Sequence, residues 1–177
     1  EHKLTVQHIY FGGGTPTAVS DEEFEEVMES IDELFLSIHP IREFTVEAGR
    51  PDTFTEKKLK IIKEAGAGRI SINPQTMKQE TLDIIGRKAS VEQVLTAYRL
   101  AREVGFDNIN MDLILGLPGE LEADVQRTIE KIVELAPDSL TVHSLAIKRA
   151  SRLNQWIQEN GVSMLHNTDE TMKIAAA

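Results

Sequence analysis

Strand-like and helix-like stretches alternate along the chain, and this order restricts the possible fold more than any other feature. Short apolar runs that suit strands are separated by stretches in which apolar residues recur at helical spacing. Strands joined by single helices and short loops run parallel, with right-handed crossovers. The pattern therefore predicts an α/β sheet or barrel with five strands, over residues 6–11, 43–48, 69–73, 109–115 and 139–147.

Local signals mark several boundaries of these elements. Ser20 with Glu23, and Ser90 with Gln93, have the spacing of capping boxes and predict the starts of two helices. Pro74 is expected to end the third strand, because proline lacks the backbone N–H that a sheet needs.

Length and charge restrict the organisation and the partners. The 177 residues suffice for one sizeable core and contain no linker-like segment, so we expect a single domain over residues 1–177. Because the last residues, 173–177, lie within a helical pattern, we expect this domain to be a piece of a longer protein. The formal net charge of -10 argues against a nucleic-acid partner. The oligomeric state stays open.

The chain contains no cysteine, no apolar run long enough to cross a bilayer and no signal peptide. These features fit a cytoplasmic protein without a membrane segment. The lack of cysteine also means that these residues provide no thiolate ligands for a metal site.

Functional residues of parallel α/β folds gather at the carboxyl ends of the strands, because the loops leading into the helices open on one face. The first strand here ends in three consecutive glycines, which cost backbone entropy and provide no packing. We therefore expect a ligand to approach this backbone closely. Other strand ends carry polar or glycine-containing segments, namely Glu47, Asn73, Gln75, residues 116–120, Ala146, Lys148 and Arg149.

Asp112 interrupts the nearly continuous apolar run 109–115, which is typical of a parallel strand covered on both faces. An acid inside such a run would point into the interior, at a high cost in desolvation unless it is paired or bound to a ligand. Two interpretations stay open. Asp112 belongs to a functional site, or it forms a buried ion pair with Arg69 or Arg87.

The other candidates also have structural interpretations. Glu47 could be a solvated acid, Gln75 a polar loop residue and Arg87 a solvated cation at a helix end, while residues 116–119 are typical of a tight turn. The five histidines lack the spacing of a metal site, and no serine-hydrolase or P-loop motif is present. Taken together, glycine backbone, two acids, an amide and an arginine suit a zwitterion that carries a sugar.

Four stretches resemble, in order and spacing, the radical S-adenosylmethionine (SAM) enzymes of the oxygen-independent coproporphyrinogen III oxidase group. They are Ile9-Tyr10-Phe11-Gly12-Gly13-Gly14-Thr15-Pro16-Thr17, Thr45-Val46-Glu47, Arg69-Ile70-Ser71-Ile72-Asn73-Pro74-Gln75-Thr76 and Asn110-Met111-Asp112-Leu113-Ile114-Leu115-Gly116-Leu117-Pro118-Gly119. The resemblance implies an incomplete parallel (β/α)6 barrel, here truncated to about five strands. It lacks the first strand and the C-terminal region.

The resemblance also implies an activity in haem biosynthesis. Members of the group use a [4Fe-4S] cluster and SAM to produce a 5′-deoxyadenosyl radical, which abstracts hydrogen from the propionate side chains of coproporphyrinogen III. The propionates are decarboxylated to vinyl groups. A porphyrinogen substrate and an electron donor are therefore the implied partners.

For the methionyl end of SAM, the resemblance implies contacts from Gly13, Gly14 and Thr15 to the amino and carboxylate groups. Arg87 would pair with the carboxylate.

For the rest of SAM, the resemblance implies that Glu47, Gln75 and Asp112 hold amino or ribose groups, and that Ala146 offers backbone to adenine. Which of the two acids serves which group stays open.

Two departures from the family pattern limit what this chain can do alone. The Cys-x-x-x-Cys-x-x-Cys loop that binds the cluster is absent, so the chain would supply half of the SAM site, no metal ligand and no catalytic residue, and would be inactive without those cysteines. Residues 73–77 replace the usual Gly-Val-Gln-Ser-Phe, and residues 142–149 also differ. Both differences resemble a divergent bacterial branch of coproporphyrinogen dehydrogenases.

Two alternatives to an oxidase remain. The first is a related radical-SAM-like protein that binds haem as a chaperone or carrier and has no oxidase activity. The second is an unrelated TIM-like barrel whose glycine loop binds phosphate.

Overall fold

The computed structural model describes residues 4–147 and 151–161. Five strands form one sheet in the order β1-β2-β3-β4-β5, and every neighbouring pair is parallel. The strands are β1 (His8–Phe11), β2 (Glu43–Glu47), β3 (Arg69–Gln75), β4 (Ile109–Leu115) and β5 (Ser139–Ser144). The predicted α/β class and the number of parallel strands are confirmed. The sheet is open, because β1 and β5 do not pair with each other.

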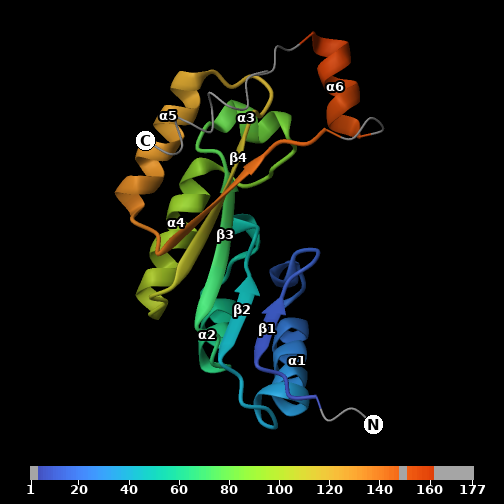
Figure 1. Ribbon diagram of the computed structural model, residues 1–177, viewed down its shortest axis with the longest axis vertical. Helices are drawn as coiled ribbons and strands as arrows, with labels where there is room; N and C mark the ends of the chain where they lie inside the picture. Colours follow the sequence, from blue (N-terminus) through green and yellow to red (C-terminus); the bar gives the residue numbers. More distant parts are fainter. Residues whose placement is uncertain (1–3, 148–150, 162–177) are drawn as a thin grey trace.

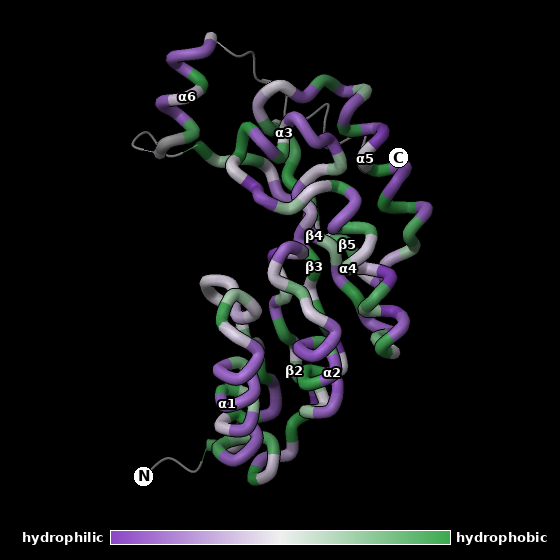
Figure 2. Tube along the Cα trace, turned by 180° about the vertical axis from the view of Figure 1, so that it is seen from behind, coloured by the Kyte–Doolittle hydropathy of each residue, from purple (hydrophilic) through white to green (hydrophobic). Residues whose placement is uncertain are grey.

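Helices cover one face of this sheet (Figures 1 and 2). Helices α1, α2, α4 and α5 lie behind the strands in Figure 1 and in front of them in the reverse view of Figure 2. The helices are α1 (Asp21–Ile31), α2 (Glu56–Glu64), α3 (Gln79–Ile84), α4 (Val91–Val104), α5 (Glu122–Leu135) and α6 (Arg152–Asn160), with short η1 (Pro16–Ala18), η2 (Asp32–Leu36) and η3 (Pro51–Thr53). No helix in the described ranges is long and apolar enough to cross a membrane.

Both predicted capping boxes are present. The Ser20 hydroxyl accepts the backbone N–H of Glu23 at 3.2 Å, and the Glu23 carboxylate accepts the backbone N–H of Ser20 at 2.9 Å. Ser90 and Gln93 make the same pair of bonds at the start of α4. Each box satisfies N–H groups that have no partner within the helix, which fixes where the helix begins.

The hydrophobic core lies between the helices and one side of the sheet. Successive strand residues point to opposite faces, so alternate positions of each strand enter this core. They are fully or almost fully buried: Phe44 and Val46 in β2, Ile70 and Ile72 in β3, and Ile109, Met111 and Leu113 in β4.

The other face of the sheet is polar, which corrects the expectation that the strand over 109–115 is covered on both faces. Asn110 and Asp112 alternate with the core residues of β4, and the Asn110 amide contacts Ser139 and Thr141 of β5 rather than a helix. The interrupting acid therefore marks the side of β4 that no helix covers, although Asn110 on the same side is only 4% exposed.

Strand boundaries differ from the sequence-based ones at four places, one of which is the end of β2 at Glu47 rather than at residue 48. β1 begins at His8, and β5 ends at Ser144, so that Ala146 lies beyond the strand. Pro74 does not end β3, because the ladder to β4 becomes irregular between Ile72 and Gln75 and tolerates the missing N–H there. Lys148 and Arg149 lie outside the described residues, as does the chain after residue 161.

Candidate functional site

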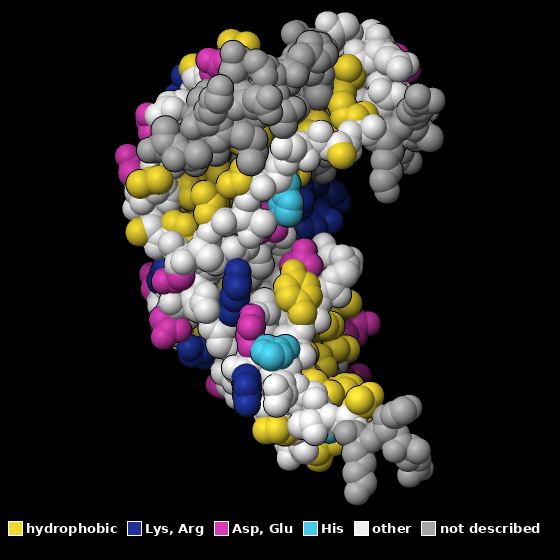
Figure 3. Space-filling model, in the orientation of Figure 1, with side chains coloured by type: hydrophobic (Ala, Val, Ile, Leu, Met, Phe, Trp, Pro, Cys, Tyr) yellow, Lys and Arg dark blue, Asp and Glu magenta, His cyan; other side chains and the backbone are white. Residues whose placement is uncertain are grey.

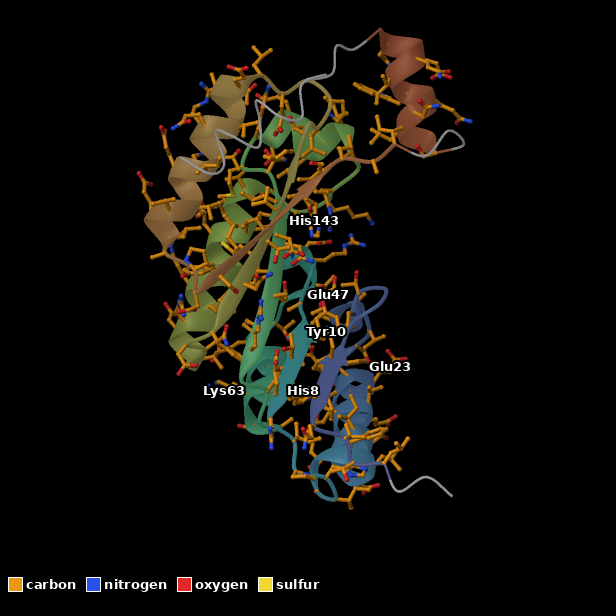
Figure 4. The ribbon with its side chains drawn as sticks, in the orientation of Figure 1. His8, Tyr10, Glu23, Glu47, Lys63 and His143 are labelled. Atoms are coloured by element: carbon orange, nitrogen blue, oxygen red, sulfur yellow. The ribbon has the colours of Figure 1, made fainter. Side chains whose placement is uncertain are left out.

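Glu47 is the centre of a polar group at the carboxyl ends of β1, β2 and β3. One carboxylate oxygen, Oε2, accepts the Tyr10 hydroxyl at 3.2 Å and the backbone N–H of Gly13 at 3.4 Å, and Oε1 accepts the Asn73 amide at 3.3 Å. Figure 4 shows Tyr10 and Glu47 next to each other on the open face of the sheet. Glu47 is thus not merely a solvated acid, since it joins three strand ends.

In the glycine loop, Gly12 lies against the protein's own side chains, whereas Gly13 and Gly14 face open space. A Cβ atom at Gly12 would lie 2.4 Å from Cε1 of Tyr10 and 2.6 Å from Oε2 of Glu47, so a side chain here would force at least one of them to move. Gly13 has a φ of +119°, which favours glycine, and nothing lies within 4 Å of a Cβ built at Gly13 or Gly14. The exposed backbone expected for ligand contact is therefore at Gly13 and Gly14.

The turn behind the glycine loop is anchored to the neighbouring β2–α2 connection. The Thr17 and Thr53 hydroxyls are 2.6 Å apart, and Thr53 also donates to the backbone carbonyl of Arg50 at 2.7 Å. Lys58, only 6% exposed, donates to the carbonyl of Thr17 at 2.9 Å and to that of Val19 at 2.6 Å. These contacts fix the position of Thr15, which directly precedes this turn.

A hydrogen-bonded chain crosses the open face from Glu47 to Asp112. From Asn73, the chain continues through the Ser71 hydroxyl, which donates to the Asn73 amide oxygen at 2.9 Å. The Asn110 amide nitrogen then donates to Ser71 at 3.0 Å and to Asp112 at 2.6 Å. The two predicted acids therefore belong to one network. Sequence reasoning missed Ser71 and Asn110, although polar residues at every second strand position were a usable signal.

Asp112 is partly exposed on the open face, so the expectation of an acid buried in the interior is wrong. The alternative of an ion pair is not realised either, since neither Arg69 nor Arg87 lies within ion-pair distance of Asp112 in the described part of the chain. The Asn110 amide holds the Asp112 carboxylate and leaves it accessible to a ligand.

Arg87 reaches the same rim from the connection between α3 and α4. Its guanidinium donates to the carbonyl oxygen of Gly49 at 3.4 Å, two residues after Glu47. Burial and the neighbouring Arg50 lower the pKa of Arg87, while Asp52 and Glu47 oppose that shift. A guanidinium stays charged even so, and this half-buried cation suits a carboxylate ligand.

Gln75 shows signs of a functional position. Its φ is +69°, which non-glycine residues rarely adopt, and its side chain is 7% exposed. The buried Oε1 atom has no hydrogen-bond partner in the protein. Strained backbone and unsatisfied buried polar atoms are concentrated at functional sites.

The structure does not connect Ala146 to this group. It is exposed, and it follows Leu145, whose N–H donates to the carbonyl of Leu115 at 2.9 Å. Among the described residues, no hydrogen bond joins Ala146 or Gln75 to the Glu47 network.

Residues 116–120 form a turn, with φ values of +81° at Gly116 and +76° at Gly119. The turn leads to Glu120, which is 3% exposed and accepts the Thr76 hydroxyl. Burial raises the pKa of Glu120 to about 7. Sequence reasoning included Glu120 only as part of the turn, because nothing in the local pattern distinguishes a buried acid from an exposed one.

The donors present fit SAM, but they do not fit an iron–sulfur cluster. Open glycine backbone, two acids, a half-buried arginine and the unpartnered Gln75 oxygen match a ligand with ammonium, carboxylate and hydroxyl groups. The chain has no cysteine, and within the described residues no three His, Cys, Asp or Glu side chains gather as a metal site. His8 and His143 lie along the open face (Figure 4), whereas His2 and His166 fall outside the described residues.

Comparison with known proteins agrees with this geometry. The family model of the radical SAM superfamily matches residues 1–132. The oxygen-independent coproporphyrinogen-III oxidase-like protein HemZ of Bacillus subtilis is 45% identical over the whole chain, which covers 35% of that protein. The heme chaperone HemW of the same organism is 39% identical over 140 residues, 79% of this chain and 37% of the relative. The chain thus spans about a third of the length of the curated relatives it matches.

Solved structures show the same fold. Coproporphyrinogen III oxidase HemN of Escherichia coli, a radical SAM enzyme, superposes with a TM-score of 0.80 over 97% of this chain and 38% of its own, at 24% identity. Elp3 of the archaeon Methanocaldococcus infernus gives 0.77 over 96% of this chain and 43% of its own, at 20% identity. The match over residues 1–132 covers most of the chain, and the chain therefore belongs to the radical SAM superfamily.

Proposed function

We propose that this chain forms the SAM-binding core of an oxidoreductase that converts propionates of coproporphyrinogen III to vinyl groups in haem biosynthesis. The observation that carries the proposal is the network that joins the Glu47 carboxylate to the Asp112 carboxylate beside open glycine backbone. The names of several relatives support the substrate. One is the oxygen-independent coproporphyrinogen III oxidase of Bradyrhizobium diazoefficiens, 34% identical over 144 residues, 81% of this chain and 32% of that protein.

The methionyl end of SAM would lie against the glycine loop. The backbone of Gly13 and Gly14, with Thr15, offers hydrogen-bonding groups that no protein side chain occupies. Arg87 donates to the carbonyl of Gly49, two residues after Glu47, and would pair with the ligand carboxylate.

The ribose and adenine would extend across the strand ends. Glu47 and Asp112 provide acceptors for hydroxyl or ammonium groups, and the Oε1 atom of Gln75 provides a third. Ala146 follows β5 and would offer its exposed backbone to the base.

When bound, SAM supplies the one-electron chemistry that removes a hydrogen atom from a substrate. This chain's own residues bind and orient that ligand, and they provide no ligands for the cluster. We place the single domain of residues 1–177 within a longer protein, whose other residues hold the cluster and receive electrons from a donor.

The test uses the protein that carries this chain, reduced under anaerobic conditions with SAM and coproporphyrinogen III. We expect protoporphyrinogen IX and 5′-deoxyadenosine, both measured by liquid chromatography. Cleavage of SAM without vinyl formation would contradict the substrate, and no cleavage in protein with an intact cluster would contradict the enzyme.

A haem chaperone is the second candidate, and the relatives named heme chaperone HemW support it. Such a protein binds haem stoichiometrically and transfers it to an acceptor without altering propionates. Haem transfer in the absence of any vinyl product would favour this candidate over the oxidase.

A further inference from the structure

A second polar pocket lies on the open face of the sheet, next to the proposed SAM site. Its volume is about 270 Å³, and it is lined by five consecutive strands. In Figure 3, charged and histidine side chains follow one another along this hollowed face. Tyr10 and Asp112 border both sites. The charged or titratable lining residues are Tyr10, Glu43, Arg69, Asp112 and His143.

The guanidinium of Arg69 leaves one of its N–H groups without a hydrogen-bond partner in this pocket. Its Nη2 atom donates to the Ser139 hydroxyl at 3.1 Å, but its Nε atom is buried and has no partner. Neither Glu43 nor Asp112 lies within ion-pair distance of Arg69 among the described residues. A buried guanidinium N–H without an acceptor costs free energy, so an acceptor from outside the protein would stabilise this arrangement.

The wall of the pocket is already fixed in position. The Asn110 amide oxygen accepts the hydroxyls of Ser139 at 2.9 Å and Thr141 at 3.1 Å, while its nitrogen donates to Ser71 and Asp112. All four hydrogen-bonding positions of this amide are occupied. Such a wall loses little conformational entropy when a ligand binds.

Arg69 and Glu43 lie at the amino-terminal end of the pocket, because they are the first residues of β3 and β2. Both also line a second cavity of about 260 Å³ at the amino ends of the strands. A ligand that enters from the carboxyl ends of the strands therefore meets these two charges last, after it has passed Asp112.

We propose that this pocket receives one pyrrole ring of the porphyrinogen, with its propionate carboxylate paired to Arg69. This inference rests on the proposed oxidase function and identifies the residue that recognises the substrate. Arg69 offers two N–H groups for a bidentate bond to a carboxylate. The single pyrrole N–H then donates to the Asp112 carboxylate, which has no ion-pair partner in the described part of the chain.

The size of the pocket agrees with a single ring. Pockets that enclose a whole drug-sized ligand have volumes of roughly 300–1,000 Å³. A volume of about 270 Å³ is too small for a tetrapyrrole. The rest of the macrocycle would stay outside, on the open side of the sheet.

The test measures binding of coproporphyrin III by fluorescence titration in the protein that carries this chain. It compares the unsubstituted protein with Arg69→Met and Arg69→Lys. Arg99→Met is the matched control, because Arg99 lies on α4 with 60% of its side chain exposed. The tetramethyl ester of coproporphyrin III is the second probe, because it keeps the ring and lacks the carboxylates.

We expect Arg69→Met to weaken coproporphyrin binding by about ten- to a hundredfold, the usual effect of losing a charge-assisted hydrogen bond. Arg69→Lys should restore part of the affinity, Arg99→Met should change nothing, and binding of the ester should be the same in all variants. Binding of S-adenosylhomocysteine by each variant shows whether the fold is intact. If Arg69→Met does not fold, Arg69→Lys still has to lower coproporphyrin affinity more than ester affinity.

Unchanged coproporphyrin binding in folded Arg69→Met would overturn the pocket assignment and leave the proposed function intact. Equal losses for coproporphyrin and ester would overturn it as well, because the carboxylate would then not be recognised. If the unsubstituted protein binds no coproporphyrin, both the oxidase proposal and this inference fail.

Discussion

The ammonium group of Lys58 donates a 2.9 Å hydrogen bond to the backbone carbonyl oxygen of Thr17, and it thereby ties helix α2 to the turn behind the glycine loop. Lys58→Met should lower the free energy of unfolding by about 3 kcal/mol, because it leaves the carbonyls of Thr17 and Val19 without a donor and removes an ion pair with Asp21. Affinity for S-adenosylhomocysteine should fall too, since the loop loses its anchor. Chemical denaturation and calorimetric titration measure the two effects.

Lys57→Met is the control for this prediction. Lys57 is the preceding residue of the same helix, its side chain is 48% exposed, and it forms a surface ion pair with Glu25. Such pairs contribute little to stability. Equal losses in the two variants would contradict a specific role for Lys58.

Gly12→Ala should destabilise the protein by about 1 kcal/mol, the low end for overpacking, because the 64% exposed Tyr10 and the end of the Glu47 side chain can shift. The new Cβ would lie 2.4 Å from Tyr10 and 2.6 Å from Glu47, so at least one of these side chains has to move. Gly14→Ala is the comparison within the same loop, because nothing lies within 4 Å of a Cβ there. Thermal unfolding should distinguish the two variants, and similar midpoints would show that Gly12 is not restricted by its neighbours.

Glu47→Gln and Asp112→Asn should each weaken binding of S-adenosylhomocysteine at least tenfold, because both variants keep the shape of the side chain and remove its charge. Asp83→Asn, on the exposed side of α3, is the control. Calorimetric titration of the protein that carries this chain gives the affinities. An effect of Asp83→Asn as large as that of the other two would refute the proposed binding site.

The stability of the protein should depend on the protonation of Glu120. Burial raises its pKa from 4.5 to about 7, so the folded state binds this proton more tightly than the unfolded state. Its contribution is therefore fully present below about pH 4.5 and is lost as the pH rises through 7. Over this range we expect a loss of about 2 to 3 kcal/mol.

Glu120→Gln should remove this part of the pH dependence, because the Gln side chain stays neutral and its oxygen still accepts the Thr76 hydroxyl. Glu122→Gln, exposed at the start of α5, should keep it. Denaturation curves between pH 4 and 8 measure the difference. The same slope in the Glu120→Gln variant and in the unsubstituted protein would mean that folding does not raise the pKa of Glu120.

Several features of the fold could be predicted because they depend on local chemistry. The capping boxes at Ser20 and Ser90 and the alternation of apolar runs are visible in neighbouring residues, and they define the helices and the parallel sheet. Motifs at the strand ends also indicated where a site would be, since parallel strands bring their carboxyl ends to one edge.

Other features depended on residues far apart in the chain. The run 109–115 does not reveal which of its faces is uncovered, because that depends on where the helices pack. Asp112 consequently had two interpretations, neither of which included Asn110 as its partner. Nor does Pro74 reveal that the β3–β4 ladder is irregular between Ile72 and Gln75, since the ladder involves a second strand.

By itself, the sequence determined the order of the elements, their parallel arrangement and the rim at which the candidate site residues gather, since periodicity and capping act over a few residues. Tertiary structure alone decided that Glu47 and Asp112 share one network, that Gly12 is restricted by Tyr10 and Glu47, and that Arg69 keeps an unpartnered N–H. These relationships arise between strands that are distant in sequence. Their geometry exists only after the core has packed the helices against one face and left the other open.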